Sequence, residues 1–338
     1  MSRIHRHAAT RKMAKTEMRA VAIDRFGGAE TLSVKNLPVP EPKAAQVLIR
    51  VGSAGLGVWD IGEREGFVAK MYGHKPTFPY VLGTEGAGKI TAVGEKVKNF
   101  RKGDLVYGLT WGTNPKAGFD AEYVAVDADW VSPIPSTLPI EQAGALMIDG
   151  AVALRGLNEI LKLKRNENLM VFGASGGVGH LAVQIGVRMG AHVFAVASGD
   201  DGVRLVLRLG AEGAVDGRKG DIVASAKRFA SKGFDAALFT ASDEGANIAL
   251  GTMRDGGRVA HPFGLALKAR STVAIKSFNG GDYWKVLPSA LIAKLNNLIE
   301  TGPFEVYISR TFPMERVEEA HAALGSHHIG KMALLPGG

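Results

Sequence analysis

The sequence predicts an α/β fold in which a doubly wound parallel sheet is joined to a smaller, barrel-like β domain. Two patterns predict this fold class. Between about residues 149 and 284, short apolar runs typical of buried strands alternate with helical patterns. Between about residues 18 and 129 the hydrophobic period is near two, and Gly and Pro interrupt it often. The length of 338 residues also favours two domains.

The clearest strand–helix unit covers residues 168–190. The apolar run Leu169–Phe172 predicts a buried parallel strand, and a helical pattern from Val178 to Met189 follows it. The turn between them reads Ala174, Ser175, Gly176, Gly177, Val178 and Gly179. This order places free backbone N–H groups at a helix N-terminus, where the helix dipole also favours negative charge. We therefore predict a pyrophosphate site, with an ordinary crossover turn as the alternative.

Further strands follow this unit at the spacing of βαβ repeats. They are predicted at His192–Ala197, Gly213–Val215, Phe234–Phe239 and Gly257–His261. This succession predicts an inserted dinucleotide-binding domain over residues 149–284.

The remaining segments are expected to form the β domain. Val47, Ile49 and Val51 occupy alternate positions, as in a strand with one buried face. A helical pattern covers Ile140–Leu161, and the C-terminal segment ends with the strand pattern Lys331–Leu335. The C-terminal segment is too small for a core of its own. We therefore expect residues 18–148 and 285–338 to form one domain.

Composition excludes several classes of protein. The mean hydropathy is +0.05 and no run of 18 apolar residues occurs, so no membrane span and a cytoplasmic location are expected. The absence of cysteine excludes disulfides, thiolate zinc sites and a cysteine nucleophile. Five of the eight net positive charges lie in residues 1–19, so a nucleic-acid-binding face is not indicated.

Residues 1–17 are predicted to be a disordered basic extension. They are rich in Arg and Lys, they lack the apolar core of a secretory signal, and Ser is scarce for a transit peptide. A start at Met13 or Met18 is the alternative to a disordered extension.

Several motifs together resemble the medium-chain dehydrogenase/reductase superfamily, and in detail its zinc-free quinone oxidoreductase branch. The resemblance covers about residues 18–336 and is carried by MRAVAIDRFGGAETL, VLGTEGAGKITAVGEKVKNFRKGDLVYG, ASGGVG, MRDGGRVAHPFG and RTFPMERVEEAHAALGSHHIGKMALL. It implies a GroES-like β-barrel domain and a Rossmann domain. It also implies direct hydride transfer from a nicotinamide cofactor to a small-molecule quinone or α,β-unsaturated carbonyl.

The resemblance also bears on metal binding. Zinc alcohol dehydrogenases of this superfamily carry a ligand Cys near the position of Gly57 and a ligand His at the position of Thr84. Glu85 and Asp60 alone cannot supply three zinc ligands, so no metal is expected. Without a metal to polarise a carbonyl, a conjugated acceptor is favoured because it spreads the developing charge itself.

The residues after the second strand indicate NADPH. Proteins that bind NAD place an acidic residue on the ribose 2′-OH about where this chain has Ala197. Ser198 is a candidate donor to a 2′-phosphate, and Arg204, or less favourably Arg218, is a candidate for the charge. A solvated helix face is the alternative for Arg204. The Lys of many NADPH-dependent relatives falls at Gly202.

Catalytic residues are indicated only by the resemblance. Asp60 matches a family Asp, with loop orientation as the alternative role. Tyr72, in the expected loop Gly66–Thr77, is a candidate hydrogen-bond donor to the acceptor carbonyl, with a structural role as the alternative. Trp59 is a candidate wall of the acceptor pocket, or else a core residue.

The resemblance assigns further contacts to the cofactor. Phe263, Gly264 and Phe278 match loops that close over the nicotinamide, and Lys331 ends a strand near the cofactor. The chain departs from the family at three positions. Gly57 replaces an Asn, Gly150 replaces a Thr, and Ile329 replaces an Arg.

The combined prediction is an NADPH-dependent quinone or enone reductase. Enoyl-thioester reduction is a second possible activity, which a basic patch at the pocket mouth would favour. The missing Asn and Thr leave a non-catalytic NADPH-binding protein as a third alternative. A homodimer is expected, because the β-branched run Thr272–Ser277 would otherwise leave an exposed sheet edge.

Overall fold

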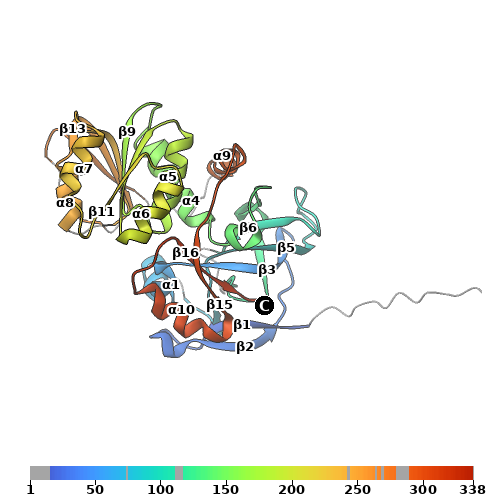
Figure 1. The fold of residues 1–338 in the computed structure, drawn as a ribbon. Coiled ribbons are helices and arrows are strands. Elements are labelled where there is room, and N and C mark those ends of the chain that lie inside the picture. Colours follow the sequence, from blue (N-terminus) through green and yellow to red (C-terminus); the bar gives the residue numbers. More distant parts are fainter. Residues whose placement is uncertain are drawn as a thin grey trace, which may run out of the picture.

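The computed structural model describes residues 16–73, 75–110, 117–241, 244–262, 265–267, 270–278 and 289–337. A helix-covered sheet and a second, barrel-like group of strands make up the molecule (Figure 1). None of the helices in these ranges has the length and apolar character needed to cross a lipid bilayer.

The first part is a six-stranded, fully parallel sheet with the order β11-β10-β9-β12-β13-β14. Its strands are β9 (Asn168–Phe172), β10 (His192–Ala197), β11 (Gly213–Asp216), β12 (Phe234–Phe239), β13 (Met253–Pro262) and β14 (Ala274–Phe278). The chain order reverses between β9 and β12. In open α/β sheets, ligands bind at the carboxyl ends of the strands beside such a reversal.

Helices cover both faces of this sheet. They are α4 (Met147–Arg155), α5 (Gly177–Arg188), α6 (Gly199–Arg208), α7 (Ile222–Phe229) and α8 (Glu244–Leu250). Leu169 and Val171 share one apolar core with residues of α4, α5 and α6. Met170 and Phe172 share another core with residues of α7 and α8. Alternate residues of β9 are therefore buried on opposite faces, which explains why this strand is apolar throughout.

The second part contains two sheets. A three-stranded sheet has the order β2-β1-β4, and a seven-stranded sheet has the order β15-β16-β3-β5-β6-β8 with β7 beside β3. The strands are β1 (Glu17–Ile23), β2 (Ser33–Pro38), β3 (Gln46–Leu56), β4 (Tyr80–Val81), β5 (Glu85–Val93), β6 (Leu105–Leu109), β7 (Tyr123–Asp127), β8 (Val131–Pro133), β15 (Ile308–Pro313) and β16 (Lys331–Leu335). The C-terminal strand β16 pairs with β3, so the end of the chain returns to the seven-stranded sheet of the barrel-like part. The predicted α/β fold class is confirmed.

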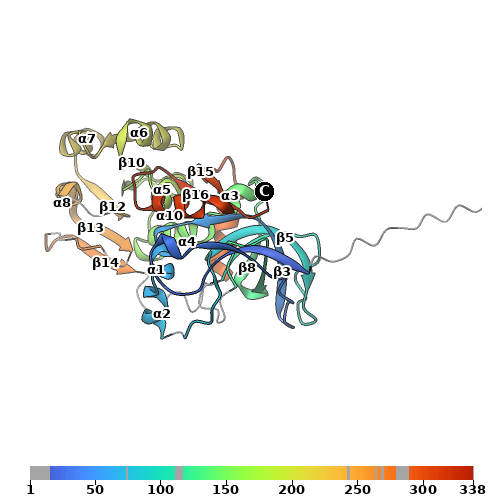
Figure 2. The ribbon, with the colours of Figure 1, turned by 90° about the horizontal axis from the view of Figure 1, so that it is seen from below.

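The remaining helices and helical turns lie between these strands along the chain. The helices are α1 (Val58–Arg64), α2 (Phe67–Tyr72), α3 (Ile140–Ala143), α9 (Ser289–Glu300) and α10 (Val317–Leu324), with a π-helical turn at Gly156–Ile160 and 3-10 turns at Ala29–Thr31, Ala128–Trp130 and Met314–Arg316. Figure 2 shows α1 and α2 next to each other at one edge of the barrel-like part.

The helical pattern predicted at Ile140–Leu161 corresponds to α3, α4 and the π-helical turn. One sequence prediction of local structure was wrong. The expected loop Gly66–Thr77 contains α2, which begins after Gly66 and ends before Gly73. Both glycines have left-handed backbone angles, with φ of 79° and 67°, so they bound a short helix rather than mark an open loop.

Candidate functional site

A cleft of about 450 Å³ lies at the carboxyl ends of β9, β10, β11 and β12 and is closed on its other side by the start of α1. The β9–α5 turn contributes Gly173, Ser175, Gly176, Gly177 and Val178 to its lining; the barrel-like part contributes Gly57, Val58 and Trp59. His327 and His328 also line the cleft, from the loop that precedes β16. The cleft therefore lies between the two parts of the molecule.

The glycine turn forms an open cradle at the N-terminus of α5. Gly176 is the N-cap of α5, and a Cβ atom there would meet only the carbonyl oxygen of Gly173, at 3.5 Å. A Cβ atom at Gly179 would lie 2.2 Å from the same oxygen, so Gly179 permits the close packing of strand and helix. A pyrophosphate fits above Gly176, because the space is free and the helix N-terminus favours an anion.

Ala174 and Ser175 hold the turn in place. Ala174 is fully buried, and its N–H donates to the carbonyl oxygen of Val196 at 2.9 Å. The Ser175 Oγ accepts the N–H of Ser198 at 3.1 Å, and the Ser175 carbonyl oxygen accepts the N–H of Gly330 at 2.7 Å. Ser175 thus ties the turn to the end of β10 and to the start of β16.

The structure distinguishes the two candidate arginines. Ala197, Ser198 and Arg218 line the cleft, whereas Arg204 lines a separate pocket with Asp201 and Arg208. Arg218 reaches the cleft because β11 lies beside β10, with Asp216 opposite Ala197. The less favoured arginine is therefore the better placed one for a 2′-phosphate.

Gly202 occupies the position of the family's lysine for a packing reason. A Cβ atom at Gly202 would lie 2.8 Å from the Cβ of Ser175. This constraint could not be predicted from the sequence, because it depends on how close α6 lies to the glycine turn.

Lys331 is buried between the two parts of the molecule. Its Nζ lies 3.1 Å from the Glu85 Oε1 and 2.9 Å from the Asp149 Oδ2, and 4.5 Å from the centre of the Trp59 ring. Burial lowers the pKa of Lys331, but the carboxylates of Asp149 and Glu85 outweigh burial and raise it. Burial also raises the pKa of Glu85, whose Oε2 accepts the N–H of Ile148 at 2.8 Å. The ammonium group of Lys331 is therefore ion-paired with two carboxylates.

Trp59 forms a wall of the cleft and explains the glycine at position 57. A Cβ atom at Gly57 would lie 2.3–2.5 Å from atoms of the Trp59 indole. The indole ring therefore fills the space that a side chain at position 57 would need. This steric coupling accounts for the absence of the family's asparagine.

Asp60 lies behind this wall and does not line the cleft. It is fully buried, and its Oδ2 accepts the Gly57 N–H at 2.8 Å, which caps α1. Thr84, at the position of the family's zinc-ligating histidine, lies with its Oγ1 3.3 Å from Glu63. In the described ranges, no group of three His, Cys, Asp or Glu side chains is arranged to hold a metal ion.

The remaining predicted residues lie elsewhere or are not described. Tyr72 is the last residue of α2. Phe278 is buried in the core, where its ring lies 3.0 Å from the position that a Cβ atom at Gly156 would take. Phe263 and Gly264 lie outside the described residues.

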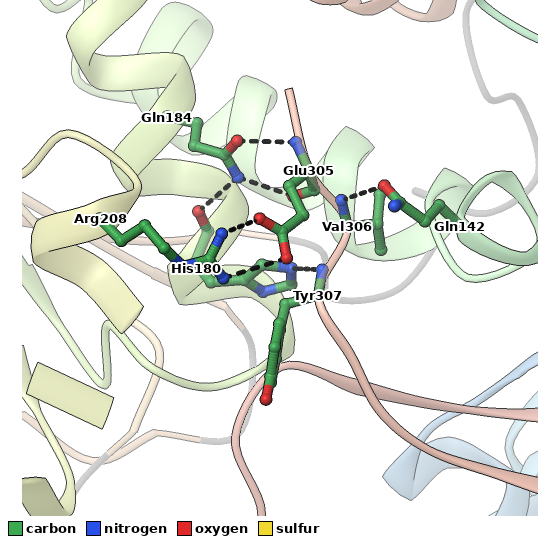
Figure 3. Close-up of polar contacts among 7 residues, drawn as sticks. All are labelled: Gln142, His180, Gln184, Arg208, Glu305, Val306 and Tyr307. Atoms are coloured by element: carbon green, nitrogen blue, oxygen red, sulfur yellow. Dashed lines mark hydrogen bonds and ion pairs between the residues drawn. The ribbon is translucent and has the colours of Figure 1, made fainter. Parts of the chain in front are cut away.

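A hydrogen-bonded segment joins the back of the glycine turn to the chain that leads into β15 (Figure 3). The Gln184 side chain pairs with the backbone of Glu305, accepting its N–H at 2.9 Å and donating to its carbonyl oxygen at 2.8 Å. Gln142 accepts the N–H of Val306 at 3.0 Å, and Arg208 forms an ion pair with Glu305. These contacts link residues that are far apart in the sequence, so no local sequence pattern could predict them.

His180 completes this connection. The Tyr307 N–H donates to its Nε2 at 3.1 Å (Figure 3). Its Nδ1 therefore carries the proton and donates to the carbonyl oxygen of Gly176 at 2.9 Å. Burial lowers the pKa of His180 to about 4, so the neutral ring persists at physiological pH. Tyr307 is in turn bonded to β16, because its carbonyl oxygen accepts the N–H of Lys331 at 2.8 Å.

Comparison with known proteins matches both parts of the chain. The family models described as "Alcohol dehydrogenase GroES-like domain" and "Zinc-binding dehydrogenase" match residues 43–136 and 177–279. Quinone oxidoreductase of Homo sapiens is 31% identical over 333 residues, which cover 94% of this chain and 98% of the human protein.

Two solved structures are also similar. The quinone oxidoreductase from Coxiella burnetii has a TM-score of 0.78 and 25% identity, covering 94% of this chain and 99% of the other. The Escherichia coli quinone oxidoreductase complexed with NADPH has a TM-score of 0.77 at 20% identity, covering 94% and 100%, and shows a likeness of fold.

Proposed function

This chain belongs to the quinone oxidoreductase branch of the medium-chain dehydrogenase/reductase superfamily, and we propose that it reduces quinones with NADPH as hydride donor. It is an oxidoreductase that uses a nicotinamide cofactor. The observation that carries the proposal is the cleft itself. It is lined by the open turn at Gly176, by the Trp59 ring and by Lys331, whose ammonium is paired with Glu85.

The cofactor, when bound, supplies a hydride to the acceptor. The backbone N–H groups at Gly177 and Val178 are placed to hold its pyrophosphate at the N-terminus of α5, whereas the Gly176 N–H donates to the carbonyl oxygen of Gly173. Ser198 and Arg218 lie where they would hold a 2′-phosphate, and Ala197 presents no carboxylate against it. These residues support NADPH over NADH.

The floor of the cleft favours a conjugated acceptor. The ammonium of Lys331 is held by Glu85 and Asp149, so it is not a free cation for polarising a simple carbonyl. A quinone or enone spreads the negative charge that develops on it and needs less electrostatic help. Trp59 and Gly57 would form one wall of the space in which the acceptor ring lies against the nicotinamide.

We propose that the reaction proceeds without zinc. The chain has no cysteine, and Gly57 and Thr84 occupy the positions of two family ligands. Elemental analysis of protein purified without a metal-affinity tag tests this. A stoichiometric zinc content, or activity that a chelator removes and zinc restores, would contradict it.

The proposal includes a homodimer in the cytoplasm. Among the residues that the structure describes, β14 is the last strand of the parallel sheet and is largely exposed along its length. An unpaired edge of this kind promotes association unless it is covered, and a second copy of the same strand would cover it symmetrically.

Steady-state kinetics test the activity. The protein is assayed with NADPH and NADH against a quinone, an α,β-unsaturated aldehyde and an enoyl thioester. The proposal expects the highest kcat/KM for NADPH with the quinone. A preference for the enoyl thioester would instead favour the enoyl-reductase alternative.

A further inference from the structure

An apolar strip, made of Val58, Phe67 and Met71, lies on the outer surface of α1 and α2. Val58 is 64% exposed, Phe67 is 59% exposed and Met71 is 47% exposed. Val58 and Phe67 have the highest exposed fractions of all large apolar side chains in the described part of the chain. Isolated exposed apolar residues are common on protein surfaces, so what matters is whether these three are contiguous.

The helix geometry makes the strip continuous. Val58 and Gly62 lie four residues apart on α1, and a Cβ atom at Gly62 would lie 3.8 Å from the Cβ of Phe67. Phe67 and Met71 are four residues apart on α2, so they lie on the same helical face. Because such neighbours are about 5–6 Å apart, the strip extends roughly 15 Å.

The strip begins inside the candidate active site. Val58 is at once the first residue of α1 and part of the cleft lining. The glycine turn and Arg218 lie in the nucleotide-binding part of the same cleft, so the polar parts of a cofactor have their own contacts. A substituent that leaves the acceptor ring over Val58 would next meet Phe67 and then Met71.

Packing behind α2 fixes this orientation. Ala69, on the opposite side of α2, is 8% exposed. A Cβ atom at Gly66 would lie 2.6 Å from the Phe26 ring, which itself contacts Phe78 edge to face with centroids 5.5 Å apart. The apolar face of α2 is therefore held outward by close contacts.

We propose that this strip binds an apolar chain carried by the acceptor, so that the preferred substrates are quinones with an alkyl or isoprenoid substituent. This inference rests on the proposed quinone reduction. The continuity of the strip with the cleft favours a substrate chain over another occupant. The exposed charges beside it, Glu65 and Lys70, have opposite signs and do not form the basic rim that attracts an anionic lipid surface. The sheet edge at β14 belongs to a different part of the molecule.

Two benzoquinones that differ only in a methyl or a decyl substituent test the proposal. In the parent protein, the decyl compound should have a KM lower by roughly tenfold, because part of its chain is removed from water. In the double variant Phe67→Ser and Met71→Ser this advantage should fall toward one. Leu207→Ser, which changes a residue on α6 that is 45% exposed, is the matched control and should keep the parental ratio.

Binding measured without turnover separates this inference from the proposed function. Isothermal titration calorimetry with the two quinones gives the dependence on chain length even if neither is reduced. A parent protein that binds both quinones equally would overturn the proposal, as would a double variant that weakens both equally. Loss of a dimer or of vesicle binding in the double variant, with the chain-length ratio intact, would assign the strip to another occupant and also overturn it.

Discussion

Replacing Gly176 by Val separates cofactor binding from folding. The position is open, since a Cβ atom there meets only the Gly173 carbonyl oxygen at an ordinary 3.5 Å, so the variant should fold. The branched side chain would occupy the space above the turn where a phosphate must approach. Each charge-assisted hydrogen bond lost is worth about 1.5–3 kcal/mol, which corresponds to a Kd for NADPH raised roughly tenfold to hundredfold.

Gly179→Ala is the contrasting variant. Its Cβ would lie 2.2 Å from the Gly173 carbonyl oxygen and 2.7 Å from the Ala174 Cα, so strand and helix must separate. Overpacking of this kind costs about 1–3 kcal/mol and should lower the melting temperature. Calorimetric titration with NADPH and thermal unfolding are measured on both variants. Parental NADPH affinity in a folded Gly176→Val protein would refute the placement of the pyrophosphate.

Three further predictions concern the 2′-phosphate contact, the buried lysine and the proposed dimer interface. Arg218→Ala should raise the Kd for NADPH about tenfold while that for NADH stays the same; equal losses for both cofactors would argue against a 2′-phosphate contact. Lys331→Met should destabilise the protein by about 3–5 kcal/mol in denaturant unfolding, because it leaves two buried carboxylates unpaired. The folded-state pKa of Glu85, which burial already raises, then rises further because the ammonium no longer lowers it, so stability is kept at acidic pH and lost as the pH increases; a pH-independent loss would contradict this. Light scattering should give twice the chain mass, and Val273→Pro with Ile275→Pro should give a monomer; a surviving dimer would place the interface elsewhere.

The parallel sheet could be predicted from the sequence because its strands are buried on both faces. His192–Ala197 and Phe234–Phe239 have the predicted bounds, since continuous apolar runs between turn residues leave little ambiguity. The glycine turn could be predicted for a similar reason, because its chemistry is local. α2 was missed because two glycines that bound a helix look the same in sequence as glycines of a loop.

The parts of the site that depend on tertiary neighbours could not be predicted. Distance along the chain favoured Arg204, whereas the pairing of β10 with β11 brings Arg218 to the cleft. Asp149 and Glu85 come from separate elements, and only the folded chain places both beside Lys331. The steric coupling of Gly57 with Trp59 could not be predicted either, because a glycine in the sequence does not show which neighbouring side chain occupies the space beside it.

The most direct test of hydride transfer within this cleft is a single-turnover experiment with deuterated NADPH. The enzyme–cofactor complex, labelled at one or the other of the two reactive nicotinamide hydrogens, is mixed with a quinone without oxygen, and cofactor absorbance is followed. One cofactor should be oxidised per quinone, deuterium should slow the reaction at only one of the two positions, and Gly176→Val should lack this phase at the same cofactor concentration. Oxidation that is insensitive to both labels, or that proceeds equally fast in Gly176→Val, would contradict it.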